Sequence, residues 1–289
     1  MPGLITQDER EFLFALGRDM ANADGVYVDA GSFLGASAEA LASGFSDARP
    51  TDRTPHVHCF DTFQTPFPET CALIKRKSGI QVQPNQSFRP IFEKNTQAVH
   101  DLLVVHEGEI GDVDVFSLPI TILFLDICKS LKTNGKVMDS FMRGLHPGVS
   151  MLVHQDYHHP HLPYIHVCTE YLAHRFEIVT PRIGESLALR LKSRPTEAEL
   201  KRVIQYDFSQ DEQIALMDGA LARLVHVDTF EMQLARLILR RRIFGHAQFS
   251  QDVSAFVKCC PSTLSARQIV YLNRIRRYVQ TSVSNFSGW

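Results

Sequence analysis

Small and acidic residues that suit ligand binding are grouped in one short segment near the start of the chain. Asp29, Gly31, Gly35 and Ser37 follow a β-branched run that begins at Val26, and the sequence AEALA after them is typical of a helix. A glycine turn between a strand and a helix lets the backbone pass close to a ligand, and the free amides of the helix N-terminus bind polar groups. The segment predicts a ligand site, although an ordinary strand-to-helix turn has the same spacing.

A second acid occurs where the next strand is expected to end. Residues 56–60 are predicted to form that strand, and Asp61 follows it directly. A carboxylate has two acceptor oxygens and can hold both hydroxyls of a ribose. The glycine turn and Asp61 together indicate an adenosine-containing ligand, and the missing G-x-G-x-x-G spacing argues against a dinucleotide.

Histidine is enriched further along, with five of the 13 histidines of the chain between residues 154 and 166. His154 and His158 flank Asp156. Asp126 follows the most apolar run of the chain, and an ionisable side chain in such a position indicates a function, because burial of a charge is costly. Imidazole with carboxylate suits zinc, iron or manganese, whereas one histidine can instead be the general base for an acceptor hydroxyl. We expect Asp126, His154 and His158 to be catalytic. The other histidines of this segment are expected to be loop or helix-surface residues without a function: His159, His161 and His166.

The elements that must position these residues alternate along the first two thirds of the chain. The patterns predict a first helix from Thr6 to about Ala23, and then strands alternating with helical connections. The strands are expected at residues 26–29, 56–60, 103–106, 120–125, 150–153, 175–179 and 185–191. No helix fits between the last two, so they should form an antiparallel hairpin. The fold class is α/β, with a Rossmann-like, doubly wound, mostly parallel sheet whose last strand is antiparallel.

The last third of the chain is predicted to be helical. Arg194-Pro195 marks a boundary, so we expect one domain over residues 1–194 and an all-helical extension over 195–289. Its helices are predicted at residues 196–203, 210–226, 229–244 and 265–281, and the last one carries Ile269, Leu272, Ile275 and Val279 on one side.

Charge is distributed unevenly between these two parts. The whole chain has a net charge of -2, but residues 236–289 carry +8, which leaves -10 for the rest. We expect the basic helices to have solvated faces, or to dock against the acidic remainder or a second subunit as a homo-oligomer. Nucleic acid ranks last among these partners, because no aromatic interleaving or binding motif accompanies the charge.

Composition restricts the class of protein. A chain of 289 residues with 44% hydrophobic and 21% charged residues is globular rather than disordered or fibrous. The six cysteines lack paired spacing, which is typical of reduced thiols. The N-terminal segment carries acids rather than the positive charge of a signal peptide. The longest apolar stretch, residues 118–125, is too short to span a membrane. We therefore expect a cytoplasmic protein with reduced thiols and no membrane partner.

One segment resembles a known family. VDAGSFLGASAEALA resembles the first motif of class I S-adenosylmethionine-dependent methyltransferases, and the segments around Asp61, Asp126 and Asp156 are similar to macrocin O-methyltransferase-like members. The resemblance covers about residues 25–192 and has no counterpart for the helical tail. It implies S-adenosylmethionine as the cofactor, with Asp61 on the ribose and Glu107-Gly108 near the adenine. The residues implied around the methionine moiety are Asp29, Gly31, Ser32, Gly35 and Ser37.

The resemblance also implies a divalent metal, held by Asp126 and Asp156, that orients the substrate hydroxyl. The chain departs from the family at two places: the second acid after Asp126 is replaced by Ile-Cys-Lys129, and an Asp-Asp pair is replaced by Gln155-Asp156. The implied activity is O-methylation of a small-molecule or sugar-containing metabolite. Two alternatives remain: a metal-dependent oxygenase or hydrolase that uses the His/Asp cluster, and a non-catalytic scaffold.

Overall fold

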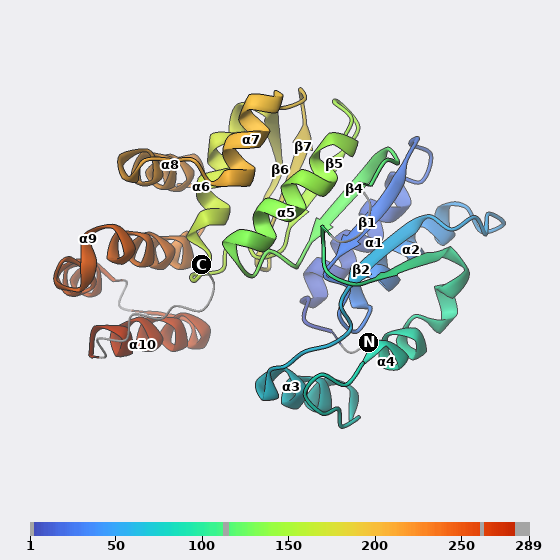
Figure 1. Cartoon of the computed structure of the whole chain (residues 1–289), viewed down its shortest axis with the longest axis horizontal. Coiled ribbons are helices and arrows are strands. Elements are labelled where there is room, and N and C mark those ends of the chain that lie inside the picture. The colour runs from blue at the N-terminus through green and yellow to red at the C-terminus, as the bar shows by residue number, and fades with distance from the viewer. Residues whose placement is uncertain (1–2, 112–115, 261–262, 281–289) are drawn as a thin grey trace. The chain divides into compact units, whose positions relative to one another are not determined.

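The central element is a twisted sheet, shown in Figure 1 with its strands side by side. The computed structural model describes residues 3–111, 116–260 and 263–280. Within them the sheet has the strand order β3-β2-β1-β4-β5-β7-β6, and every neighbouring pair is parallel except β5–β7 and β6–β7. The predicted mostly parallel sheet with an antiparallel last strand is confirmed. The strands are β1 (Val26–Ala30), β2 (Val57–Asp61), β3 (Leu103–Glu107), β4 (Ile120–Leu125), β5 (Met151–His154), β6 (Phe176–Ile183) and β7 (Ser186–Leu191).

Helices connect the strands and follow them. Those up to the end of the sheet are α1 (Gln7–Asp19), α2 (Ala36–Ala48), α3 (Pro68–Ser78), α4 (Arg89–Asn95), α5 (Leu131–Phe141) and α6 (Pro163–Tyr171), with short 3-10 turns at Gln97–Leu102, Met142–Gly144 and Ala173–Arg175. Those after it are α7 (Glu197–Gln205), α8 (Gln210–Arg223), α9 (Phe230–Cys259) and α10 (Ala266–Gln280). Among the described helices, none is both long and apolar enough to cross a bilayer.

The described chain divides into two compact units. The first takes the described parts of residues 1–127, 136–155 and 175–194, and the second takes those of residues 128–135, 156–174 and 195–289. The second unit is therefore more than the helical tail, because two segments that follow β4 and β5 belong to it. A division into domains 1–194 and 195–289 stays a prediction.

The core of the first unit follows from the period-two alternation of the strands. Tyr27, Cys59 and Phe124 are buried on one face of the sheet, in a cluster with side chains of α1 and α2. Phe60 points to the opposite face, where its ring lies 5.1 Å from that of Phe141 in α5. Helices on both faces make this a doubly wound sheet.

A buried carboxylate ties α1 to the β6–β7 hairpin. Glu9 is 2% exposed, and its Oε1 accepts hydrogen bonds from Ser186 Oγ at 2.7 Å and from the Glu185 N–H at 3.2 Å. Its Oε2 accepts the N–H of Thr6 at 2.7 Å in the predicted capping box. The helix ends at Asp19 rather than near Ala23.

The second unit has an apolar core of its own, formed by α9 and α10 (Figure 1). Helix α9 does not end at Phe244 as predicted: it is interrupted by a kink at Gly245, with φ 83° and ψ -176°, and continues to Cys259. Leu272 and Ile275 of α10 are buried in this core, whereas Ile269 is 46% exposed. The predicted last residue of this helix, Thr281, lies outside the described residues.

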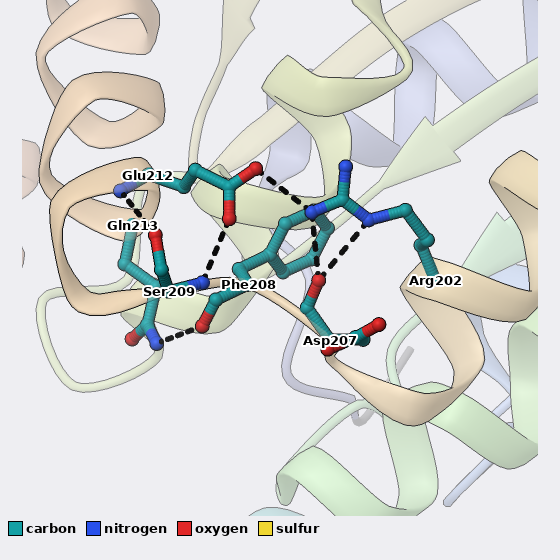
Figure 2. A network of polar contacts seen from close by, with 6 residues as sticks. All are labelled: Arg202, Asp207, Phe208, Ser209, Glu212 and Gln213. Carbon is teal, nitrogen blue, oxygen red and sulfur yellow. Dashed lines mark hydrogen bonds and ion pairs between the residues drawn. The ribbon is translucent and has the colours of Figure 1, made fainter.

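A network of polar contacts fixes the junction between α7 and α8, as Figure 2 shows. Arg202 donates to the backbone carbonyl of Asp207 at 2.8 Å and to Glu212 Oε1 at 2.8 Å. Glu212 also accepts the N–H of Ser209, which is the reciprocal half of a capping box. The Arg202 side chain thereby connects the end of α7 to the first turn of α8.

Candidate functional site

The turn after β1 is held by hydrogen bonds within the segment singled out from the sequence. Ser32 Oγ donates to the carbonyl of Asp29 at 3.0 Å, and Ser37 Oγ donates to Asp29 Oδ2 at 3.0 Å. Gly35 is the N-cap of α2, with φ 91°, and it supplies no side-chain cap to the amides of the first helical turn. These amides form a polar surface suited to a carboxylate.

Asp29 is an acid whose environment favours the protonated form. Its side chain is fully buried, and Oδ1 has no hydrogen-bond partner among the described residues. Burial raises the pKa of Asp29 to about 7, against the lowering effect of the Ser32 and Ser37 hydrogen bonds. A buried oxygen without a partner is costly, so a ligand group that donates a hydrogen bond or carries positive charge would be stabilised there.

Gly31 lies where the turns after β1 and β4 touch. A Cβ on Gly31 would lie 2.6 Å from the carbonyl oxygen of Asp126, and its φ of 98° is in the region that favours glycine. The Asp126 N–H donates to the carbonyl of Ala30 at 2.8 Å. The strand order reverses between β1 and β4, so Asp126 and the glycine turn share the switch point where open α/β sheets bind ligands.

Asp61, at the end of β2, accepts two backbone hydrogen bonds. Its Oδ2 accepts from the Phe33 N–H at 2.9 Å, and its Oδ1 accepts from the Phe63 N–H at 2.7 Å. Each oxygen has two lone pairs, so one acceptor site remains on each for the hydroxyls of a ribose. Burial raises the pKa of Asp61, and the two N–H donors oppose that shift.

Glu107 and Gly108 follow at the end of β3. Glu107 is the register partner of Asp61, and the Gly108 N–H donates to the Asp61 carbonyl at 3.0 Å. The Glu107 carboxylate is partly exposed and accepts from Arg89 Nη1 at 2.9 Å. Both predicted adenine-side residues therefore lie beside Asp61, and Glu107 has a cationic partner that the sequence did not indicate.

His154 is the last residue of β5 and is 1% exposed, in register with Leu125 on one side and Leu187 on the other. The N–H of Gln155 donates to the Leu125 carbonyl at 2.9 Å. The ends of β4 and β5 are therefore adjacent, which brings the backbone of His154 beside the segment that precedes Asp126.

Asp156 belongs to the second unit, where it forms an ion pair with Lys129. The Asp156 side chain is 4% exposed, and its Oδ2 lies 2.6 Å from Lys129 Nζ. Lys129 itself is 56% exposed. The lysine that stands in place of the family's second acid thus brings positive charge to a carboxylate predicted to bind metal.

The histidines of this segment are less exposed than predicted. His158 and His166 are fully buried, with ring centroids 5.4 Å and 5.0 Å from that of Tyr157, so placing His166 on a helix surface was wrong. His159 and His161 are half-buried and face Tyr271 of α10, at 6.1 Å and 6.4 Å between centroids. Burial lowers the pKa of these last two histidines to about 4 and about 3.

The described residues give no support for a divalent ion at the predicted ligands. Within residues 3–111, 116–260 and 263–280, no three side chains of His, Cys, Asp or Glu are grouped so that they could hold one. Asp156 is paired with an ammonium group instead. We therefore assign no step to a metal, and no grouping in these residues favours the oxygenase or hydrolase alternative.

Sequence reasoning missed a pair of histidines, one buried and one half-buried, on the strands that end at Asp61 and Glu107. His58 Nδ1 and His106 Nε2 are 2.9 Å apart, and the ring of Phe60 stacks on that of His106 at 4.2 Å. Burial lowers the pKa of His58 to about 4, with a smaller contribution from His106. The signal was present: residues 58 and 60 share one face of β2, and the parallel register places residue 106 opposite residue 60.

The chain is a Rossmann-like α/β protein, as its strand order, its switch point and the turn after β1 define.

No protein-family model matches the chain, and no curated protein matches it in sequence. Among solved structures it is similar to the O-methyltransferase NovP, at 17% identity and a TM-score of 0.48, over 64% of this chain and 80% of that one. It is also similar to the calicheamicin methyltransferase CalS11, at 17% identity and a TM-score of 0.47, over 63% of this chain and 78% of that one. The same coverage and identity hold for the structure described as apo CalS11, a TDP-rhamnose 3'-O-methyltransferase, with a TM-score of 0.43.

Proposed function

We propose that this chain is an S-adenosylmethionine-dependent methyltransferase that acts on a hydroxyl of a small-molecule or sugar-containing metabolite. The observation that carries the proposal is the placement of two carboxylates, one buried and one half-buried, around one glycine turn. Asp29 has an oxygen without a partner, and Asp61 has one acceptor site left on each oxygen. A nucleoside with a cationic amino-acid moiety satisfies both.

The residues of the turn fit each part of the cofactor. Asp29 Oδ1 would accept the ammonium group of the methionine moiety, and the uncapped amides at the start of α2 would bind its carboxylate. Asp61 would hold the ribose hydroxyls, and Glu107 and Gly108 lie beside it on the adenine side. Ser32 and Ser37 hold Asp29 in position. When bound, the cofactor supplies an electrophilic methyl group on a sulfonium.

We assign the acceptor side to residues at the ends of β4 and β5. Asp126 directly follows β4, His154 ends β5 and His158 lies four residues further along the chain. The step requires alignment of the acceptor oxygen with the methyl group, and a base that takes the hydroxyl proton. The bound cofactor would supply the methyl group to the acceptor oxygen, and the C–S electron pair would remain on its sulfur. We propose that Asp126 or His154 is the base; His158 belongs to the second unit, and its catalytic role stays a prediction.

Isothermal titration of the full chain with S-adenosylhomocysteine tests the cofactor site. The wild type should bind it, and Asp61→Ala should weaken binding by at least about tenfold, since a carboxylate hydrogen bond to a ligand contributes about 1.5–3 kcal/mol. Asp101→Ala is the matched control. Asp101 lies in the 3-10 turn that precedes β3, and its carboxylate forms an ion pair with Arg53 at 3.6 Å. Absence of binding by the wild type, or equal binding by both variants, overturns the proposal.

A further inference from the structure

The second unit contains a groove that the proposed methyl transfer does not use. It has a volume of about 750 Å³ and is lined by α8, by both halves of α9 and by the residues between these helices. Ligand pockets for small molecules typically have about 300–1,000 Å³. All of its lining residues belong to the second unit, so the groove exists independently of the site around Asp29 and Asp61.

Two ion pairs line the groove and leave it with no net charge. Arg236 binds Asp218 through Nε and Nη2, the latter at 3.2 Å, and Arg240 binds Asp252 through Nε at 2.7 Å and Nη2 at 3.4 Å. Two arginines and two aspartates are the charged residues of its lining. A strongly ionic ligand would compete with one partner of each pair, whereas a neutral ligand can bind without breaking either.

The same pairs offer hydrogen-bonding atoms of both kinds. The Nη1 nitrogens of Arg236 and Arg240 have no hydrogen-bond partner among the described residues. The carboxylate oxygens keep further lone pairs, and Gln233 adds an exposed amide. Donors and acceptors that ion pairs hold in place suit hydroxyl groups, since a hydroxyl both donates and accepts.

Apart from Thr229, the rest of the lining is apolar and includes one aromatic ring. Phe256 and Ala255 come from the second half of α9, and Val225, which is 79% exposed, follows α8. A lining that combines apolar side chains with paired charges suits a molecule with a C–H face and a hydroxyl rim. A pyranose ring has this amphipathic shape, and burial of its C–H face on apolar side chains is favourable.

We propose that this groove is a binding site for a neutral pyranoside. The ion pairs Arg236–Asp218 and Arg240–Asp252 receive the hydroxyls, and Phe256 packs against the C–H face. The inference does not depend on the methyltransferase proposal, because no cofactor residue takes part in it. It assigns a carbohydrate-binding role to α8 and α9, where Arg236 and Arg240 are paired with Asp218 and Asp252 rather than used for an anionic partner.

Saturation-transfer difference NMR on the full chain tests the groove, with the methyl α-pyranosides of D-glucose, D-galactose, D-mannose and N-acetyl-D-glucosamine as probes. We expect saturation transfer to the C–H protons of at least one probe. The signal should be lost in Ala255→Trp, which fills the groove, and retained in Ala247→Trp. Both alanines are exposed residues of α9, and only Ala255 lines the groove.

Phe256→Leu serves as a second groove variant should the tryptophan disturb folding, which circular dichroism reports. It should weaken binding of the best probe by about fivefold or more, because an aromatic contact contributes about 0.5–1.5 kcal/mol beyond area burial. Four results would overturn the inference: no signal from any probe with the wild type, equal signals from both tryptophan variants, unchanged binding in Phe256→Leu, or tenfold tighter binding of glucose 6-phosphate than of the neutral glucoside. Binding of S-adenosylhomocysteine, measured separately, reports on the other site.

Discussion

Asp61 and Phe33 are joined by a hydrogen bond of 2.9 Å from the backbone N–H of Phe33 to Asp61 Oδ2. The other oxygen of Asp61 accepts the N–H of Phe63. Both phenylalanines have positive φ, 44° and 51°, a conformation that costs on the order of 1–3 kcal/mol for a non-glycine residue. The carboxylate proposed to hold the ribose therefore also stabilises the strained turns after β1 and β2.

Asp61→Asn should accordingly lower stability as well as cofactor affinity. An amide leaves one oxygen and one NH₂ group to face two N–H donors, so one buried donor loses its acceptor. We expect a loss of about 1–3 kcal/mol in the free energy of unfolding, measured by urea denaturation without ligand. Asp101→Asn is the control and should change stability by less than about 0.5 kcal/mol. Equal stability of Asp61→Asn and the wild type would contradict the structural role of this carboxylate.

Asp29 should make cofactor binding release a proton. The pKa of Asp29 is raised from 3.8 to about 7, so at pH 6 the folded protein holds a proton that an incoming ammonium group would displace. Titration with S-adenosylhomocysteine in buffers of different ionisation enthalpy should show a proton released at pH 6 and nearly none at pH 8.5. Asp29→Asn should abolish the release, and Asp47→Asn, on the exposed side of α2, should keep it.

The same raised pKa has a defined effect on stability without ligand. Between about pH 4 and pH 7 the folded state binds the Asp29 proton more tightly than the unfolded state, so this group makes the free energy of unfolding fall as pH rises. Urea titrations of Asp29→Asn across this range should lack that contribution. A difference between wild type and variant that does not change with pH would show that Asp29 titrates normally.

Buried histidines should oppose this trend and make the protein sensitive to acid. The pKa of His56 is lowered from 6.5 to about 4 by burial, so its contribution to stability is present above pH 6.5 and is lost as pH falls toward 4. His56 stacks on Phe45 at 4.1 Å, and its Nε2 has no partner among the described residues. We expect His56→Phe to gain about 1–2 kcal/mol more stability at pH 5 than at pH 8.

Thermal denaturation of His56→Phe at the two pH values measures this difference. His226→Phe replaces an exposed histidine of the second unit and should show no such pH-dependent gain. An equal shift in melting temperature at both pH values for His56→Phe would mean that the gain comes from packing alone.

Lys129 should stabilise the Asp156 carboxylate in the absence of metal. Lys129→Met removes a cation 2.6 Å from a side chain that is 4% exposed, and we expect a loss of about 1–2 kcal/mol, reduced because the lysine is half exposed. Adding Asp156→Asn to this variant should recover part of the loss, whereas Lys132→Met, at an exposed position, should have little effect. Melting temperatures in EDTA and in Mg²⁺ should agree for the wild type; a rise in Mg²⁺ would restore the metal assignment.

Among the polar residues of α1, substitution of Glu9 should lower the free energy of unfolding most. Glu9→Gln leaves an NH₂ group facing donors from Thr6, Glu185 or Ser186, and we expect a loss of about 1–3 kcal/mol in urea. Glu11→Gln, on the same helix, removes only the charge of an exposed residue that contacts Gln7. Equal stability of the two variants would show that the hairpin is held by other contacts.

Local patterns were sufficient for the elements of the sheet and for the residues around the first two strands. The alternation of β-branched runs with helical spacing predicted all seven strands, and a glycine turn followed by a helix was visible in residues 29–37. The continuation of α9 beyond Gly245 was not predicted. The helical spacing up to Phe244 is the same whether the helix ends there or resumes after one non-helical residue.

The sequence by itself determined which residues end the parallel strands, because strand length and polarity are local properties. Only the tertiary structure decided their partners: the orphan oxygen of Asp29, the two N–H donors of Asp61, the Lys129 contact of Asp156 and the burial of His166. Each of these depends on segments that are distant in sequence or on packing around the side chain. Protonation and metal binding depend on burial and neighbouring charge, which no spacing of residues specifies.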